Sequence, residues 1–207
     1  MQFPEFREFK TRGAGDADPN GHHPTLVVDV APITHSPLEI IEEAAVQLRT
    51  AIAAELLMTL KAVRPVFFEQ LVLDLLVKLG YGGSRQAVQH VGRSGDGGID
   101  GIIDEDRLGL DAVYVQAKRW DGTVGRPVVQ GFAGALLGAG ARKGVFMTTG
   151  TFSKDAQIFA AHQHIALIDG PRLAELMIET GLGVSVEATY SVYRLDSDYF
   201  DPDPLAP

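Results

Sequence analysis

The stretch SGDGGIDGIIDEDRLGLDAVYVQAKRW, residues 94–120, joins a glycine-rich segment to a short apolar strand that carries two polar side chains. Side chains of a β-strand point alternately to its two faces. Gln116 and Lys118 must therefore share one face, and the apolar residues that alternate with them face the core. The strand segment 112–119 contains no acidic residue. The strand itself therefore does not explain why an ammonium group lies there.

Asp100, at the start of the preceding predicted strand, is the nearest candidate partner, because a hairpin of this length brings it beside Gln116 and Lys118. Glycines at 95, 97, 98 and 101 would let a ligand approach Asp100 closely. Carboxylate and amide oxygens suit Mg²⁺, and a neighbouring ammonium suits a phosphate or a developing hydroxide. This corner is a candidate site for phosphodiester hydrolysis. The alternative interpretation is a buried Asp–Lys pair beside a glycine-rich turn.

The glycine-rich segment does not match the common nucleotide-binding motifs. It precedes a strand and does not open a helix, so it is no dinucleotide fingerprint. It also lacks the G-x-x-x-x-G-K-[ST] spacing of a P-loop.

Composition narrows the class of protein. The chain has 207 residues, of which 45% are hydrophobic and 22% charged, as in an ordinary globular protein. The formal net charge of −9 argues against unspecific coating of nucleic acid but allows a local basic groove. Without cysteine, disulfides, thiolate metal sites and cysteine nucleophiles are excluded. No bilayer-spanning run or secretory signal is visible, so we expect a cytoplasmic protein without a membrane partner.

The hydrophobic pattern predicts a mixed α/β fold, a β-sheet flanked by helices. A capping box at Ser36–Glu39 begins a long helix over 36–60, and a second helix runs from Pro65 to Leu79. Strands are predicted at about 87–92, 99–104 and 112–119. Helices over 126–141, 153–164 and 170–183 then alternate with strands over 143–150 and 165–169. This alternation indicates parallel pairing, and the tight turns before 112 indicate antiparallel pairing. The pattern up to Tyr193 predicts a further edge strand.

The residues Asp100 and Gln-x-Lys resemble the PD-(D/E)xK nuclease superfamily, in the variant where glutamine replaces the middle acid. Four blocks in the same order are similar to the catalytic domain of Mrr-type restriction endonucleases. They are FFEQLVLDLLVKLGYGG (67–83), GRSGDGGIDGIIDEDRLGLDAVYVQAKRW (92–120), VQGFAGALLGAGARKGVFMTTGTFSKDA (129–156) and IALIDGPRLAELMIETGLGV (165–184). The helix from residue 36 resembles the segment that precedes this domain.

The resemblance implies a restriction-endonuclease-like fold that cuts DNA, usually methylated DNA, with Mg²⁺ as cofactor and Mn²⁺ as a substitute. By position in the motif, Asp100 would hold the metal and Gln116 would supply an amide oxygen. Lys118 would orient the attacking water and stabilise the charge of the transition state. Glu69, in the first core helix, would support the metal or its waters.

Basic residues near this corner are candidates for contacts with DNA phosphates: Arg119, Arg126 and Lys154. Each alone is otherwise a solvated surface charge. Ser153, with Thr148 and Thr149, lies at a strand-to-helix turn whose N–H groups would bind a phosphate, and plain helix capping is the alternative. Trp120 would stack on a base or pack beside the end of its strand.

We expect four segments: a flexible leader over 1–35, a linking helix over 36–63, a nuclease-like catalytic domain over 64–193 and an acidic disordered tail over 194–207. The leader is too short for the winged-helix domain usual in this family. The predicted function is Mg²⁺-dependent endonucleolytic restriction of methylated DNA. Alternatives are a non-catalytic DNA-binding or assembly module with the same fold, and a repair or junction nuclease. Because one site cuts one strand, double-strand cleavage predicts a homo-oligomer, with the helix over 36–60 as a candidate contact.

Overall fold

The computed structural model describes residues 35–82, 88–90, 98–105 and 111–200. The main sheet has five strands in the order β1-β2-β3-β5-β7. They are β1 (Val88–His90), β2 (Gly101–Asp104), β3 (Ala112–Lys118), β5 (Gly144–Thr148) and β7 (Ile165–Ile168). The helices are α2 (Pro37–Ala62), α3 (Pro65–Lys78), α4 (Arg126–Gly138), α5 (Lys154–His162) and α6 (Gly170–Thr180).

The pairing of the strands confirms the predicted mixed sheet. β1 and β2 pair antiparallel, as do β2 and β3. β3 pairs parallel with β5, and β5 parallel with β7. Helices α4 and α5 supply the crossovers that parallel neighbours require. The antiparallel hairpin brings the start of β2 beside the end of β3, where the predicted site residues lie.

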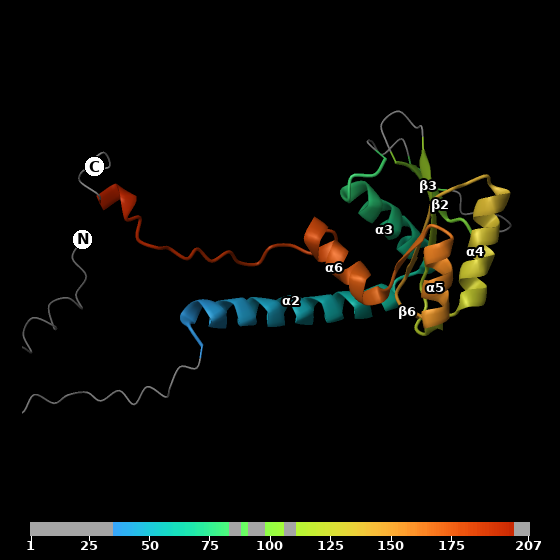
Figure 1. Ribbon diagram of the computed structural model, residues 1–207. Helices are drawn as coiled ribbons and strands as arrows, with labels where there is room; N and C mark the ends of the chain where they lie inside the picture. The colour runs from blue at the N-terminus through green and yellow to red at the C-terminus, as the bar shows by residue number, and fades with distance from the viewer. Residues whose placement is uncertain (1–34, 83–87, 91–97, 106–110, 201–207) are drawn as a thin grey trace, which may run out of the picture. The chain divides into compact units, whose positions relative to one another are not determined.

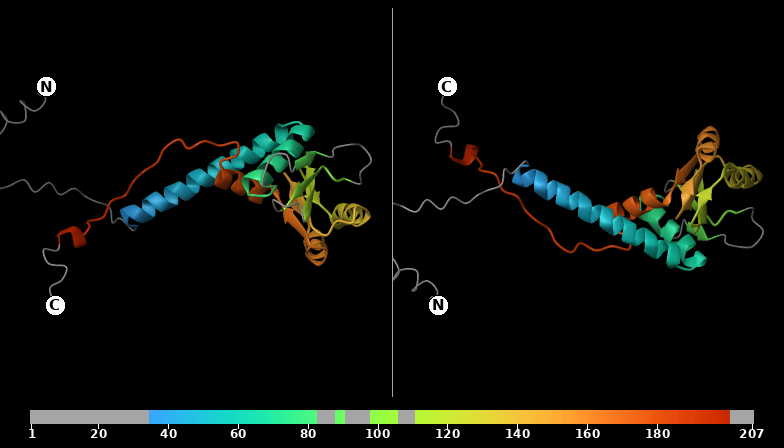
Figure 2. Two further views of the ribbon diagram at one scale, coloured as in Figure 1. Left: turned by 90° about the horizontal axis from the view of Figure 1, so that it is seen from above. Right: turned by 90° about the horizontal axis from the view of Figure 1, so that it is seen from below.

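Two layers of helices cover the two faces of the sheet, with α3 and α6 on one face and α4 and α5 on the other (Figure 1). The two further views show the same separation (Figure 2). On the first face, Val113 and Val115 of β3 pack in one cluster with apolar side chains of α3 and α6. On the second face, Phe146 of β5 meets Phe132 of α4 edge to face, at a centroid distance of 5.6 Å. Since Val113 and Val115 face the first layer, the alternation along β3 turns Gln116 and Lys118 to the second face.

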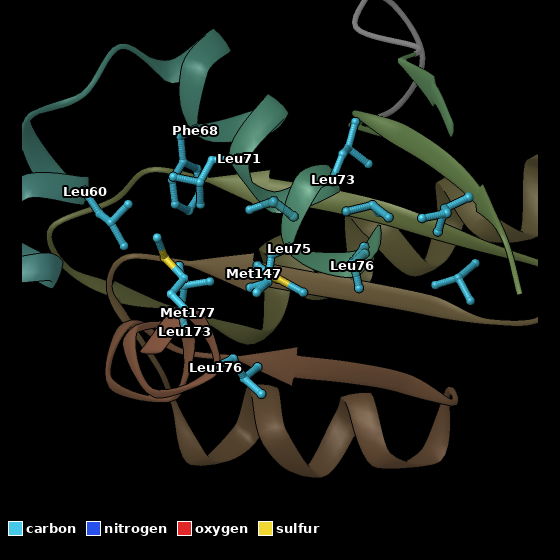
Figure 3. Packing of buried hydrophobic residues seen from close by; sticks show 14 residues of the cluster. Leu60, Phe68, Leu71, Leu73, Leu75, Leu76, Met147, Leu173, Leu176 and Met177 are labelled. Atoms are coloured by element: carbon cyan, nitrogen blue, oxygen red, sulfur yellow. The ribbon is translucent and has the colours of Figure 1, made fainter. Parts of the chain in front are cut away.

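The core of the first face is built mostly from leucines (Figure 3). Phe68, Leu71 and Leu75 point from α3 toward the strands, and Met147 of β5 lies against them (Figure 3). Leu60, from the last turn of α2, is also buried here. The C-terminal end of α2 therefore belongs to the folded core, whereas Val46, Leu48, Ile52 and Met58 of the same helix are exposed.

The two serines predicted to cap helices, Ser36 and Ser153, both do so. Ser36 N–H donates to the Glu39 carboxylate, and Glu39 N–H donates back to Ser36 Oγ at 3.3 Å. The bond from the Ser36 backbone holds the pKa of the Glu39 carboxyl below its ordinary value. α5 begins after Ser153, whose Oγ accepts from Ala156 N–H at 3.2 Å.

A second, small sheet was not predicted. It pairs β4 (Thr123–Val124) parallel with β6 (Thr151–Phe152). Both strands have only two residues, which is too short for an alternating pattern to stand out in the sequence. Since α4 starts at Arg126 and α5 at Lys154, this pairing places the N-termini of the two helices side by side.

The predicted edge strand up to Tyr193 is wrong. Residues 184–196 form no strand, and Val186, Tyr190 and Val192 are exposed. An alternating pattern specifies two faces but no partner, and an extended segment without a neighbouring strand gains no ladder of hydrogen bonds. A 3₁₀ turn, η2 (Asp198–Phe200), follows within the segment predicted to be disordered. The predicted leader, apart from residue 35, and residues 201–207 of the predicted tail lie outside the described residues.

Within the part of the chain that the structure describes, no helix combines the length and apolar character needed to cross a membrane.

Candidate active site

The junction between β2 and β3 brings Asp100 against the end of β3. The paired register ends at Gly101 opposite Val115. One residue earlier, Asp100 N–H donates to Val115 O at 2.8 Å. The Asp100 carboxylate oxygen Oδ2 accepts from Ala117 N–H at 2.7 Å. The carboxylate therefore lies at the backbone between Gln116 and Lys118, as the hairpin argument predicts.

Gln116 has a buried oxygen with no hydrogen-bond partner. Its side-chain Oε1 is the one atom of this kind among the described residues. A buried, unpaired amide oxygen is costly, and such groups call for a functional explanation. Gly98 makes room for this side chain, since a Cβ atom on Gly98 would lie 2.5 Å from Gln116 Nε2. Gly98 also has a φ of +97°, which side chains other than glycine rarely adopt.

Lys118 lies over an aromatic ring and forms no ion pair with another described residue. Its Nζ is 4.3 Å from the centroid of Trp120. Asp100 and Lys118 are both described, and no ion pair joins them. The alternative interpretation, a buried Asp–Lys pair, therefore lacks the contact it requires. The ammonium group remains available to a phosphate oxygen or a water at the end of the strand.

Two buried threonines at the end of β5 hold the segment that follows Lys118. Thr148 Oγ1 donates to Lys118 O at 2.8 Å, and Thr149 Oγ1 donates to Trp120 O at 2.9 Å. Thr149 Oγ1 also accepts from Trp120 N–H at 2.9 Å. The sequence placed these threonines at a possible phosphate cradle, but their hydroxyls serve the neighbouring strand end. That role depends on the parallel pairing of β3 and β5, which no local sequence motif predicts.

Glu69 belongs to α3, which covers the first face of the sheet together with α6. It is half-buried, and no hydrogen bond within the described residues joins it to Asp100, Gln116 or Lys118. The helix does run toward the site. Gly82 N–H, just past α3, donates to Asp104 O at the far end of β2, and Leu73 packs on Gly101 at the near end. Glu69 precedes Leu73 by one turn, on the same side of α3.

The glycines around Asp100 do not all open space for a ligand. A Cβ atom on Gly101 would meet Leu73 at 2.6 Å, so this position makes room for the core. That part of the prediction is wrong, because the packing of α3 on β2 was not visible in the sequence. Glycines 95 and 97 lie outside the described residues.

The predicted phosphate-contacting residues have different surroundings. Arg119 donates through Nη1 to Lys61 O at 2.5 Å and so binds the C-terminal end of α2. Arg126 is exposed, with its guanidinium 5.2 Å from the ring centroid of Phe159. Lys154 is exposed at the start of α5, and Ser153 caps that helix. Arg126 and Lys154 thus stand at adjacent helix N-termini, beyond the end of β3 that carries Lys118.

The donor set of this corner fits a hard divalent ion. Within the described residues, no cluster of three or more His, Cys, Asp or Glu side chains forms a metal site. The Asp100 carboxylate and the unpaired Gln116 oxygen instead provide an acid and an amide, both of which are oxygen ligands suited to Mg²⁺ or Mn²⁺.

Comparison with protein families assigns residues 60–177 to the restriction endonuclease family Mrr_cat. The chain belongs to the Mrr family of restriction endonucleases. It is 52% identical over 167 residues to the type IV methyl-directed restriction enzyme EcoKMrr of Escherichia coli (strain K12). That match covers 80% of this chain and 55% of the relative, so the chain spans about half the length of that Mrr protein.

Two solved structures extend the comparison. The DNA modification-dependent restriction endonuclease AspBHI aligns with a TM-score of 0.52 at 18% identity, covering 66% of this chain and 36% of that one. The MspJI restriction endonuclease in complex with a 27-mer oligonucleotide aligns with a TM-score of 0.45 at 27% identity, covering 62% and 31%. The likeness to AspBHI shows that this Mrr-family chain has the fold of a restriction endonuclease.

Proposed function

We propose that this Mrr-family chain is the catalytic part of a metal-dependent endonuclease that hydrolyses phosphodiester bonds in methylated DNA. The observation that carries the proposal is the unpaired, buried Oε1 of Gln116, on the strand whose Ala117 N–H binds the Asp100 carboxylate. An oxygen held in that state lacks a partner, and a bound cation would supply one. The ammonium of Lys118 lies two residues further along the same face.

Each side chain would have a separate task. Asp100 and Gln116 would hold Mg²⁺, or Mn²⁺ in its place, through one carboxylate and one amide oxygen. Lys118 would bind the attacking water or a phosphate oxygen and offset the negative charge that develops in the transition state. When bound, the metal supplies Lewis acidity to the scissile phosphate and lowers the pKa of a coordinated water.

Glu69 would complete the site from the other helical layer. Its place in α3 supports this, because Leu73, one turn later in the helix, lies against Gly101, the residue after Asp100. A second carboxylate there would bind waters of the metal and would not need to touch the metal itself.

DNA would approach along the edge that carries Lys118. Arg126 and Lys154 offer two exposed positive charges at helix N-termini, where backbone N–H groups also favour phosphate. Ser153 would add its O–H as a donor, since its oxygen only accepts from Ala156 N–H, whereas Arg119 is held by Lys61 O and would not belong to this edge. A chain with a net charge of −9 needs such a local basic edge to bind DNA.

Methylated DNA is the proposed substrate because the Mrr relative of E. coli is described as methyl-directed. We propose that restriction of modified foreign DNA is the biological role, which places the protein in the cytoplasm with DNA.

We also propose the division into leader (1–35), linking helix (36–63), catalytic domain (64–193) and tail (194–207), and a homo-oligomer formed through α2. The exposed apolar residues Val46, Leu48 and Ile52 support α2 as the contact.

The test is cleavage of supercoiled plasmid with and without methylation, in Mg²⁺, Mn²⁺ or EDTA. We expect nicking only with a metal ion and preferentially on methylated DNA. Lys118→Ala should abolish it while circular dichroism stays unchanged. DNA binding without cleavage by the wild type would instead support a non-catalytic module, and cleavage confined to branched DNA would support a junction nuclease. Light scattering tests the oligomer, and a monomer at all concentrations would exclude it.

A further inference from the structure

Trp120 combines a fixed backbone with an exposed side chain. Its N–H and its carbonyl both bind the hydroxyl of Thr149, each at 2.9 Å. Thr149 is only 1% exposed. Gly150 packs against the same segment so closely that a Cβ atom there would lie 2.1 Å from Gly122 O. Trp120 as a whole is nevertheless 43% exposed, so the protein holds in place a residue that remains at the surface.

The face of this ring is occupied by the ammonium of Lys118, 4.3 Å from the ring centroid. A cation at this distance is attracted by the negative face of the indole. Among the described residues Lys118 has no carboxylate partner. The ring therefore provides the contact that limits where the end of the lysine side chain can lie.

A lysine that acts on a reacting water or phosphate must be held in place. Its four-carbon stem has many rotamers, and a misplacement of about 1 Å at a reacting group can cost about a hundredfold in rate. An acid beside the ammonium would restrain it but would also compete with the phosphate for it. An aromatic face restrains the ammonium without taking its hydrogen-bond donors.

We infer that Trp120 is a positioning residue for Lys118, and that Thr149 positions Trp120. The inference rests on the proposed function, because it concerns the rate of that cleavage. Thr149 fixes the backbone that follows Lys118, Trp120 presents its ring, and the ring holds the ammonium at the end of β3. In this arrangement Trp120 would act only through the lysine.

Fluorescence tests the contact without any need for activity. Trp120 is the one tryptophan of the chain, so all indole emission reports on it. Lys118→Met removes the ammonium and keeps the length of the stem, and it should change the emission maximum or intensity of Trp120. The control is Lys78→Met, whose ammonium binds Thr180 O and which should leave the emission as in the wild type. Identical emission in Lys118→Met and wild type would overturn the contact, even if the proposed nuclease activity were absent.

Kinetics test the consequence for catalysis. Trp120→Leu should lower kcat by about tenfold to a hundredfold, with KM and the Kd for methylated DNA in Ca²⁺ unchanged. Trp120→Phe keeps an aromatic face and should retain kcat within about threefold. A loss of DNA affinity with kcat preserved would show that the ring stacks on a base and would overturn the inference.

Thr149 gives a second, independent pair of variants. Thr149→Val removes the hydroxyl at nearly constant volume and should lower kcat as Trp120→Leu does. Thr149→Ser restores the hydroxyl and should recover the wild-type kcat. If the wild type, Thr149→Val and Thr149→Ser have equal kcat, Thr149 does not position Trp120. If Thr149→Val fails to fold, the Trp120 variants still test whether the ring positions Lys118. Absence of metal-dependent cleavage in the wild type would instead contradict the proposed function and leave the fluorescence result standing.

Discussion

Asp100 Oδ2 accepts the backbone N–H of Ala117 at 2.7 Å, at the point where the pairing of β2 and β3 ends. The carboxylate thus satisfies a strand N–H that would otherwise lack a ladder partner. One side chain thereby has two tasks, since it closes the hairpin and faces the residues on either side of Ala117. Substitutions at Asp100 should separate these tasks.

Asp100→Asn keeps an oxygen acceptor for Ala117 N–H and removes the negative charge. We expect plasmid cleavage to disappear while the free energy of unfolding in urea stays within about 1 kcal/mol of the wild type. Asp100→Ala leaves the N–H unpaired and should lose about 1–3 kcal/mol as well as activity. Cleavage by Asp100→Asn at the wild-type rate would remove Asp100 from the metal site.

Gln116→Leu replaces an unpaired buried oxygen with an apolar group of similar size. In the absence of metal we expect a melting temperature equal to or above that of the wild type, because a buried polar atom without a partner is lost. Excess Mn²⁺ should raise the melting temperature of the wild type and not that of the variant. Gln130→Leu, at an exposed position of α4, is the matched control and should respond to Mn²⁺ as the wild type does. An equal response of Gln116→Leu would show that the amide oxygen binds no metal.

Gly98→Ala should damage both the backbone and the site. The φ of +97° strains any other residue by about 1–3 kcal/mol, and the new methyl group would meet Gln116 Nε2. We expect a lower stability in urea and a weaker response to Mn²⁺. Gly131→Ala, in α4 with open space around it, should instead gain about 0.5–1 kcal/mol. Wild-type stability and metal response in Gly98→Ala would mean that Gln116 does not depend on this glycine.

The basic residues should differ in their effect on DNA binding. For each DNA phosphate that the protein no longer neutralises, the slope of log K against log salt concentration becomes shallower by about 0.9. We expect Arg126→Ala and Lys154→Ala each to make that slope shallower, as measured by fluorescence anisotropy in Ca²⁺. Arg119→Ala should leave the slope unchanged and destabilise the protein, because its guanidinium binds Lys61 O at the end of α2. A shallower slope with unchanged stability in Arg119→Ala would show that Arg119 contacts a DNA phosphate.

The sequence by itself determined a mixed α/β sheet flanked by helices, and the two faces of its central strand. Alternation along β3 separates Val113 and Val115 from Gln116 and Lys118, and burial confirms the two faces. Helix starts at Ser36 and Ser153 were visible because capping needs residues only three positions apart. Asp100 and the Gln-x-Lys pair could be placed together because a hairpin joins them through a short connection.

Only the tertiary structure decided what binds these groups across the fold. Thr149 meets Trp120 from 29 residues away, and Arg119 meets Lys61 from 58 residues away. Gly101 makes room for Leu73, and residues 184–196 form no strand despite their alternating pattern. Periodicity reports which face of an element is apolar, since that depends on the residue's own neighbours in the chain. It does not report which distant backbone group lies opposite, because that is set by how whole helices and strands pack.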